Sequence, residues 1–238
     1  MKGVSECGSL VQIGNAKFKF KICRGGRRKH RHIDDSNEIV NIYLAFDPSI
    51  SPYYKVISVA QQLLGGSWVF HEYSFQTRSW ISAGAGVSSP TQLSLKGARA
   101  KCVYCNRAIH WCRKSEFSMY FNVDTLRLIK HWRMPLSDSE WVNRDISYFG
   151  ESGGRLHLAV TYAKQTLIYD IFELKEDYSG WSLKHRVDLN PLRHMYEGLS
   201  NCVLTIVGPV NKEKSLLVLL ASATEGTLVV YDPVTSRN

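Results

Sequence analysis

Alternation of apolar and polar residues is the dominant pattern along the chain. It is seen in residues 17–22, 155–160 and 227–231. Because successive side chains of a strand point to opposite faces, a period of two is typical of a sheet with one buried face. No long amphipathic helical pattern competes with it. The sequence therefore predicts an all-β protein.

Turn signals separate these runs of alternating residues. They are pairs of glycine, or of proline with aspartate, asparagine or glycine, at residues 47–48, 65–66, 153–154, 190–191, 208–209 and 232–233. Glycine permits positive φ and proline presets a turn, so the chain is expected to double back as short antiparallel strands. Many short strands of this kind favour a sandwich, a barrel or a propeller.

A repeated motif favours the propeller. In each copy an aromatic residue is followed by polar turn residues and often by a tryptophan; the aromatic residues are Tyr73, Phe121, Phe172 and Tyr231. The steps between them, about 48, 51 and 59 residues, are close to the ~50-residue period of kelch-type blades. Each copy would be one small sheet whose outermost strand ends in the motif and whose apolar faces are covered when neighbouring blades stack on it.

We therefore expect a kelch-like β-propeller that is incomplete at its N-terminus, with four blades plus a partial one. A chain of 238 residues, 44% of them hydrophobic, is long enough to bury one core, so a single domain over residues 1–238 is expected. The blades are expected at residues 39–81, 100–134, 145–189 and 202–238, with the partial blade and a basic loop in residues 1–38.

Several segments resemble, in the same order, the F-box-associated interaction domain of plant F-box proteins. The first is residues 44–49, followed by 54–56, where an Asp-Pro turn separates two strands. The most specific is Tyr-Phe-Gly-Glu-Ser-Gly-Gly-Arg-Leu-His-Leu at residues 148–158. The others are residues 73–80, 108–111, 120–124, Trp181 and 187–189. Together they span about residues 40–235, nearly the whole chain.

This resemblance implies a binding domain that presents protein substrates to an SCF-type (cullin-RING) ubiquitin ligase. In the family, a separate N-terminal F-box helical module docks on a Skp-type adaptor. No leucine- and proline-rich segment of that kind precedes the expected propeller. A Skp-type adaptor is therefore expected as a partner only if an F-box is present elsewhere, whereas a protein substrate of unknown identity is expected in either case.

One residue departs from the family pattern at a hairpin turn. Arg107 follows Asn106 where the family usually has Asn-Gly. A type I′ turn needs positive φ at both central residues, which arginine tolerates poorly. A looser turn is therefore expected at this hairpin.

A serine motif and an acidic pair could be taken for catalytic sites. Residues 150–154 match the Gly-x-Ser-x-Gly nucleophile elbow around Ser152, but the alternating residues 155–158 predict a strand where the elbow needs a helix. The same glycines do not form a nucleotide-binding Gly-x-Gly-x-x-Gly motif. The adjacent Asp34 and Asp35 would point apart in an extended segment. We expect a hairpin turn at residues 150–154, no enzyme and no cofactor.

Three cysteines and a histidine begin like a zinc knuckle. They are Cys102, Cys105, His110 and Cys112. Two residues three apart on a strand point to opposite faces, so Cys102 and Cys105 could share one metal ion only if the strand were broken. Cysteines packed as small apolar residues are favoured over a metal site.

A basic run is the other charged feature of the chain. Thirty lysines and arginines against 21 acidic residues give a formal net charge of +9. Residues 24–32 contribute Arg24, Arg27, Arg28, Lys29 and Arg31 without apolar periodicity. An exposed loop is favoured. The alternative is a nuclear-import signal or a clamp on nucleic-acid phosphates, with Arg27, Arg28, Lys29 and Arg31 as the binding residues, although few aromatic residues are interleaved for base stacking.

The tryptophans are candidates for blade packing or for partner contact. Trp80, Trp111 and Trp181 recur at strand positions of the repeat, so they are expected to pack between blades. Trp141 lies between polar neighbours in a connection and is expected to be exposed. Because large amphipathic rings often anchor interfaces, Trp141 and the nearby Arg144 are candidate partner-binding residues. A sugar-binding propeller is a further alternative.

The compartment follows from what the sequence lacks. No run of eighteen apolar residues occurs, and the first residues lack the basic-then-apolar order of a secretory signal. A soluble protein of the cytoplasm or nucleus, without a membrane partner, is therefore expected. Six irregularly spaced cysteines are expected to be reduced thiols.

Overall fold

Strands, turns and two short 3-10 helices make up the fold. The structure, a computed structural model, describes residues 8–13, 16–21, 37–62, 67–82, 101–115, 117–137, 139–162, 167–194, 202–207, 217–222 and 228–231. The 3-10 helices are η1 (Glu140–Asn143) and η2 (Asn190–His194). In these ranges no helix has the length and apolar character that crossing a membrane requires. The predicted all-β class is confirmed.

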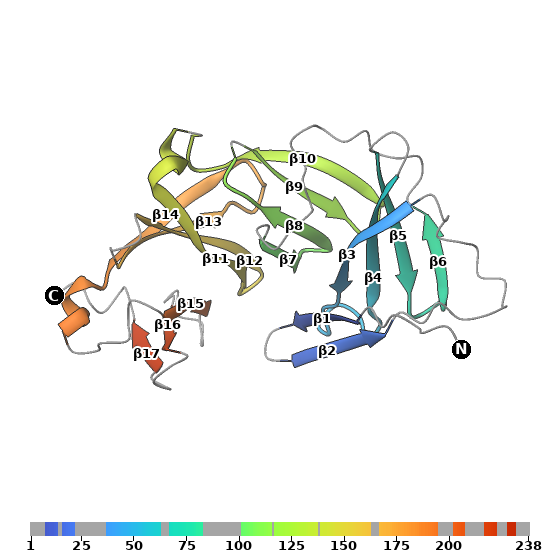
Figure 1. Ribbon diagram of the computed structural model, residues 1–238, viewed down its shortest axis with the longest axis horizontal. Helices are drawn as coiled ribbons and strands as arrows, with labels where there is room; N and C mark the ends of the chain where they lie inside the picture. Colours follow the sequence, from blue (N-terminus) through green and yellow to red (C-terminus); the bar gives the residue numbers. More distant parts are fainter. Residues whose placement is uncertain are drawn as a thin grey trace, which may run out of the picture. The chain divides into compact units, whose positions relative to one another are not determined.

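Three sheets are four-stranded antiparallel meanders, in which strands that follow one another in the sequence pair side by side (Figure 1). Sheet B contains β3 (Asn37–Ala45), β4 (Lys55–Gln62), β5 (Trp68–Ser74) and β6 (Ser79–Ser82). Sheet C contains β7 (Lys101–Cys105), β8 (Ala108–Cys112), β9 (Phe117–Asn122) and β10 (Arg127–Arg133). Sheet D contains β11 (Arg144–Ser152), β12 (Arg155–Tyr162), β13 (Ile168–Leu174) and β14 (Trp181–Asp188).

Two smaller sheets come from the two ends of the chain. Sheet A is the hairpin of β1 (Gly8–Ile13) and β2 (Ala16–Lys21). Sheet E is the antiparallel meander of β15 (Cys202–Val207), β16 (Leu217–Ser222) and β17 (Leu228–Tyr231). The segments predicted as strands at residues 17–22, 155–160 and 227–231 fall on β2, β12 and β17.

The chain divides into two compact units. The first contains Met1–Ala98 and Asn122–Leu128, and the second contains Arg99–Phe121 and Ile129–Asn238. Sheets A and B lie in the first unit, and sheets D and E lie in the second. The prediction of a single domain over residues 1–238 stays a prediction.

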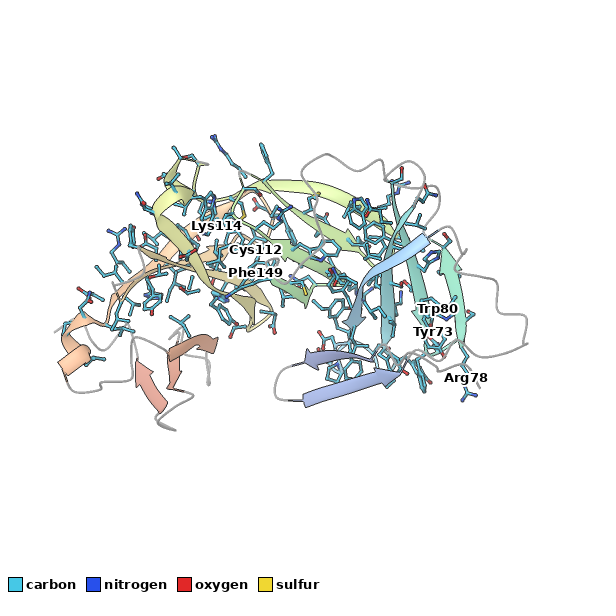
Figure 2. The ribbon with its side chains drawn as sticks, in the orientation of Figure 1. Tyr73, Arg78, Trp80, Cys112, Lys114 and Phe149 are labelled. Carbon is cyan, nitrogen blue, oxygen red and sulfur yellow. The ribbon has the colours of Figure 1, made fainter. Side chains whose placement is uncertain are left out.

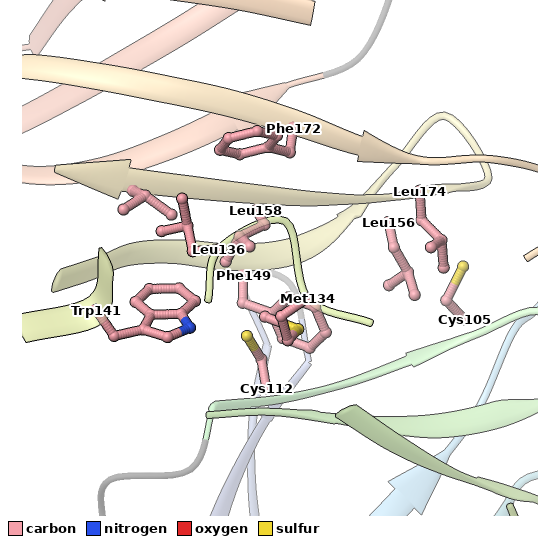
Figure 3. Packing of buried hydrophobic residues seen from close by; sticks show 11 residues of the cluster. Cys105, Cys112, Met134, Leu136, Trp141, Phe149, Leu156, Leu158, Phe172 and Leu174 are labelled. Atoms are coloured by element: carbon pink, nitrogen blue, oxygen red, sulfur yellow. The ribbon is translucent and has the colours of Figure 1, made fainter. Parts of the chain in front are cut away.

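An apolar cluster joins sheet C to one face of sheet D in the second unit (Figure 3). Cys105 and Cys112 come from sheet C, whereas Leu156 and Leu158 come from β12. The cluster also contains Met134, Leu136, Trp141, Phe149, Val160, Phe172 and Leu174. Burying each large side chain contributes about 1.5–3 kcal/mol, so this cluster is a main source of the unit's stability.

The opposite face of sheet D carries a second cluster that reaches sheet E. Ala159 and Ile171 are fully buried there and pack with Leu204 of β15. Leu158 and Ala159 are neighbours in β12 but belong to different clusters, which is the period-two alternation of the sequence seen in three dimensions. Four-stranded sheets stacked face to face in this way are the arrangement of a partial β-propeller, and the predicted fold class is confirmed.

In three of its four copies the repeated motif lies on a different strand from the one predicted. Tyr73 and Phe121 lie near the ends of β5 and β9, Phe172 lies in β13, and each of these is the third of four strands. For these three copies the prediction that the motif ends the outermost strand was wrong, whereas Tyr231 ends β17, an edge strand of sheet E as described. The polar residues after the aromatic residue form the turn that leads into the fourth strand, so the motif marks a hairpin rather than an edge.

The Asn106–Arg107 hairpin is tighter than predicted. Cys105 pairs with Ala108, so Asn106 and Arg107 are the whole connection between β7 and β8. Both residues have positive φ, 49° and 60°. A two-residue link must follow the twist of its strands, and the type I′ turn that does so needs left-handed backbone at both positions. The expectation of a looser turn was therefore wrong.

Candidate interaction surface

Large apolar side chains are exposed at one end of sheet B. We call Ile50, Tyr53, Phe75 and Trp80 the aromatic patch, since each of the four is exposed. They come from the loop between β3 and β4 and from the hairpin of β5 and β6. The backbone N–H of Phe75 donates to the carbonyl of Tyr54 across a distance of 3.1 Å, which joins the loop to the hairpin.

Ring contacts order the aromatic patch. The Tyr54 and Phe75 rings stack with their centroids 4.7 Å apart, and Tyr53 lies 6.4 Å from Phe75. On the neighbouring pair of strands, Tyr73 and Trp80 lie opposite each other with centroids 5.3 Å apart. Figure 2 shows Tyr73 and Trp80 side by side, with Arg78 extending from the end of the same hairpin.

Short polar turns hold the segments that carry the aromatic patch. The carboxylate of Asp47 accepts hydrogen bonds from the backbone N–H and the hydroxyl of Ser49, at 2.9 and 2.6 Å. These bonds lower the pKa of Asp47, with the hydroxyl of Ser49 as the largest cause. Such aspartate turns fix a loop without a regular element. The aromatic patch is therefore presented on defined turns.

A buried ion pair lies in the same unit. Glu72 is almost fully buried, and the Lys55 ammonium lies 3.3 Å from its carboxylate. Burial raises the pKa of Glu72, and the charge of Lys55 offsets this only in part. Lys55 also donates to the carbonyl of Val123 at 3.2 Å. These contacts tie strand β4 to the turn after β9, so we interpret the pair as structural.

A second group of polar residues lies on sheet D, with one residue from each strand. We call Arg144, Tyr162, Asp170 and Arg186 the arginine–tyrosine cluster. Arg186 holds the carboxylate of Asp170 with two hydrogen bonds, from Nε at 2.6 Å and from Nη2 at 2.9 Å. The Tyr162 hydroxyl donates to Asp170 and accepts from Arg186 Nη2 at 2.7 Å. The Cζ atom of Arg144 lies 4.4 Å from the centroid of the Tyr162 ring.

Charge and burial oppose each other at Asp170. Its side chain is only 5% exposed, and burial acts to raise its pKa. The hydrogen bonds from Arg186 and Tyr162 and the nearby arginine charges outweigh burial, so the pKa lies below the usual value. The pKa of Tyr162 is raised by burial and by its bond to Asp170. Asp170 is thus ionised and the Tyr162 phenol is protonated at neutral pH.

A further carboxylate on sheet D is surrounded by cations. Glu173 lies 2.9 Å from Lys184, 3.1 Å from Arg155 and 3.4 Å from His157 Nε2. Burial acts to raise the pKa of Glu173. The opposing effect of Lys184 and Arg155 is larger, so the pKa lies below its usual value. The pKa of His157 is lowered, because burial outweighs the attraction of Glu173.

Only some of the predicted partner-binding residues lie in the part of the chain that the structure describes. Arg27, Arg28, Lys29 and Arg31 lie outside the described residues. Arg144 is half-buried in the arginine–tyrosine cluster.

The predicted exposure of Trp141 was wrong, because it is 4% exposed and packs with Phe149 and Leu158 (Figure 3). The 3-10 turn of η1 directs Trp141 inward while its neighbour Val142 is exposed.

The other tryptophans divide between packing and exposure. Trp181 packs against the cluster between sheets C and D, so the packing predicted for it is confirmed. Trp111 is buried, and its packing between blades stays a prediction. Trp80 is 44% exposed, and the prediction that it packs between blades was wrong. It lies on β6, which forms an edge of sheet B among the described strands.

The serine motif that was considered as a catalytic site lies in a hairpin. Ser152 pairs with Arg155 across a hairpin whose turn is Gly153 and Gly154, both with positive φ, and β12 follows directly. The predicted hairpin turn is confirmed. The strand after it cannot form the strained strand-to-helix turn of a hydrolase elbow.

The cysteines lie as alternation requires. Cys102 is exposed and Cys105 and Cys112 are buried, all three as free thiols. Burial raises the pKa of the Cys112 thiol well above its usual value. Across the part of the chain that the structure describes, no three His, Cys, Asp or Glu side chains gather as metal ligands would.

Both surfaces depend on contacts that the sequence pattern does not report. The aromatic patch combines a loop and a hairpin that are separated by the whole of β4. The arginine–tyrosine cluster draws on four strands, and of its members the sequence analysis singled out Arg144 alone. Ring stacking and ion pairing between strands become visible only when the register is known.

Comparison with known proteins gives one distant sequence relationship. No family model matches the chain. The chain is 27% identical over 169 residues to an F-box protein of Arabidopsis thaliana, which covers 64% of this chain and 39% of the relative. The chain thus spans well under half of that protein's length.

Solved structures show weaker likeness. Oligogalacturonate lyase from Vibrio parahaemolyticus matches with a TM-score of 0.41 at 8% identity, covering 83% of this chain and 58% of that one. The nidogen/laminin complex matches with a TM-score of 0.34 at 7% identity, covering 77% and 73%. The chain is thus distantly similar to a plant F-box protein, and its own sheets define an all-β fold built from propeller-type blades.

Proposed function

We propose that this chain is a non-catalytic protein-interaction domain that recognises substrates for an SCF-type (cullin-RING) ubiquitin ligase. The observation that carries the proposal is the similarity to a plant F-box protein over 64% of the chain. Recognition of a protein substrate needs a rigid scaffold with exposed anchor residues, and the four-stranded sheet B with its connecting turns supplies both.

The aromatic patch is the surface that we assign to the substrate. Trp80, Phe75 and Tyr53 are exposed although each ring is large and mostly apolar. Exposed aromatic clusters on soluble proteins mark interaction sites, and tryptophan and tyrosine are enriched among residues whose loss costs most affinity. Arg78, exposed beside them (Figure 2), adds a donor for the polar rim of such an interface.

The test is a comparison of the wild-type chain with a patch variant in plant cells. The variant combines Tyr53→Ser, Phe75→Ser and Trp80→Ser. Because the three side chains are exposed, we expect folding to be retained. Substrates should bind the variant at least about thirtyfold more weakly, since loss of one hot-spot residue costs about 2 kcal/mol. Captured proteins would be quantified by mass spectrometry, and their half-lives measured with and without the chain.

A matched control is Val142→Ser, which removes an exposed apolar residue from η1 outside the aromatic patch. The proposal expects proteins that bind the wild type and the control, are lost with the patch variant, and persist longer in cells lacking the chain. Binding that is unaffected by the patch variant contradicts the assigned surface. Bound proteins whose ubiquitylation and half-life do not depend on the chain contradict the ligase role.

A Skp-type adaptor belongs to the same proposal only when an F-box is joined to the domain. Translating the genomic sequence upstream of Met1 tests for an F-box in the same reading frame. If one is found, the longer protein should co-purify with a Skp-type adaptor. Failure of that longer protein to bind the adaptor would count against an SCF-type complex.

A further inference from the structure

Arg144 is the member of the arginine–tyrosine cluster whose guanidinium has no hydrogen-bonded partner among the described residues. Arg186 has two hydrogen bonds to Asp170, whereas the Arg144 side chain forms neither a hydrogen bond nor an ion pair with a described residue and acts on Asp170 through its charge alone. Its guanidinium lies over the Tyr162 ring. An arginine placed over an aromatic face keeps its N–H groups available at the edge of the guanidinium for a further acceptor.

Each nearby carboxylate already has partners. Asp170 is held by Arg186 and Tyr162. Glu140 accepts hydrogen bonds from the backbone N–H and the hydroxyl of Ser137, both at 2.8 Å. Asp145, next to Arg144 in β11, forms an ion pair with Lys114. The cluster therefore has two guanidinium groups and one carboxylate, and the remaining positive charge is at Arg144.

The surroundings of Arg144 are ordered before any ligand arrives. The Tyr162 hydroxyl is fixed because it donates to Asp170 and accepts from Arg186. The Tyr162 ring in turn supports the Arg144 guanidinium from one side. Arg144 is half-buried, so its charge is less screened than that of a fully exposed arginine. Groups that are held in place beforehand lose less entropy on binding, which favours affinity.

We propose that Arg144 binds an oxyanion, the carboxylate or phosphoryl group of an acidic or phosphorylated side chain on the protein partner. Both groups accept two parallel N–H donors from one guanidinium edge. The inference rests on the proposed function in naming a protein as the source of the anion, but the site itself is tested with small anions and without any partner. Failure of the site therefore leaves the aromatic patch experiment unaffected.

The experiment follows the arginine Nε–Hε signals of the full chain by NMR during separate titrations with inorganic phosphate and with acetate. A saturable shift centred on Arg144 is expected, with smaller shifts at Arg186. Tighter binding of phosphate would identify a phosphorylated side chain as the source, whereas equal or tighter binding of acetate would identify aspartate or glutamate. A short single-stranded oligonucleotide forms a third titration.

Three variants separate the roles of charge, shape and position. Arg144→Gln should weaken binding of the anion about tenfold, which is the effect of losing a charge-assisted hydrogen-bond pair. Arg144→Lys keeps the charge but not the two parallel donors, so it should weaken binding by less. The control Arg127→Gln removes an exposed arginine at the start of β10 and should leave the affinity unchanged. Matching thermal unfolding curves would establish that the variants are folded.

The titrations give different results if the proposal is right and if it is wrong. A saturable shift at Arg144 that is lost in Arg144→Gln and retained in Arg127→Gln supports the proposal. Equal shifts at all exposed arginines, or no shift with either small anion, overturn it. A response to the oligonucleotide alone overturns it as well, in favour of a nucleic-acid surface.

Discussion

At the residue scale, Tyr148 and Gly150 show how one side chain fixes its neighbour. The two residues lie two apart in β11 and share a face of the strand. A Cβ atom added at Gly150 would overlap the Oη and Cζ atoms of Tyr148, so the ring occupies the space that a side chain would need. Tyr148 packs against the cluster between sheets D and E, and burial raises the pKa of its phenol to about 12.

We predict that Gly150→Ala lowers the free energy of unfolding by about 1–3 kcal/mol, because the new methyl group forces the Tyr148 ring out of its packed position. In the Tyr148→Ala background the same substitution should cost about 0.5 kcal/mol or less. Urea unfolding of the four proteins measures the coupling. Equal costs in both backgrounds would show that the Tyr148 ring is not the obstacle.

Other single residues could not be predicted from their neighbours in the sequence. Trp141 and Val142 lie between the polar pairs 139–140 and 143–144, yet a single 3-10 turn buries Trp141 and leaves Val142 exposed. Arg107 adopts left-handed backbone because a two-residue hairpin demands it. In both cases local geometry decides the outcome, so the polar surroundings of Trp141 gave the wrong exposure.

At the scale of elements, sheet D has charged groups on opposite faces. Asp170 lies on the face of the cluster with sheet C, together with Phe172, whereas Glu173 and His157 lie on the other face. The alternation of β12 and β13 predicted two faces with different environments. It did not predict which polar residues would pair, because pairing follows from the register and from the bulge between Ile171 and Phe172.

The state of His157 predicts how stability depends on pH. Its pKa in the folded chain lies below the usual value of 6.5, mainly because of burial, although the charges of Glu173 and Glu151 and a hydrogen bond to the backbone of Arg155 act in the opposite direction. The unfolded chain therefore binds the proton more readily. The free energy of unfolding is not reduced by His157 above pH 6.5, and it decreases as the pH falls below 6.5. His71, whose pKa is lowered by burial, acts in the same direction.

We therefore expect the free energy of unfolding to decrease between pH 7 and pH 5.5, by at most about 1.4 kcal/mol per pH unit for each histidine. His157→Gln should reduce this dependence and leave the part due to His71. Urea unfolding at several pH values measures both. A variant with the same dependence as the wild type would show that His157 does not contribute. At lower pH the carboxylates of Glu173 and Asp170, with lowered pKa values, add a further loss.

At the scale of the whole molecule, the net charge of +9 predicts weak attraction to nucleic acid. Such binding comes from released counterions and falls steeply as salt is raised. We expect measurable association with single-stranded RNA at 50 mM salt and little at 200 mM. Replacing Arg27, Arg28, Lys29 and Arg31 with serine should reduce the low-salt association and its salt dependence, as measured by fluorescence anisotropy.

This comparison also separates two functions. Under the proposed function, the serine variant keeps its protein partners and the aromatic patch variant loses them. Tight RNA binding at 200 mM salt that disappears in the serine variant would instead favour the nucleic-acid alternative.

The sequence by itself determined the all-β class, the repeated hairpins and the turn at Gly153–Gly154. These features follow from period-two alternation and from the backbone freedom of glycine, and both are local properties of the chain. Only the tertiary structure decided that Trp141 is buried, that Trp80 is exposed, and that Arg144 lies over Tyr162. Exposure and pairing depend on which strand lies at a sheet edge and on cross-strand register. Those are relations between residues far apart in the sequence, so no local pattern encodes them.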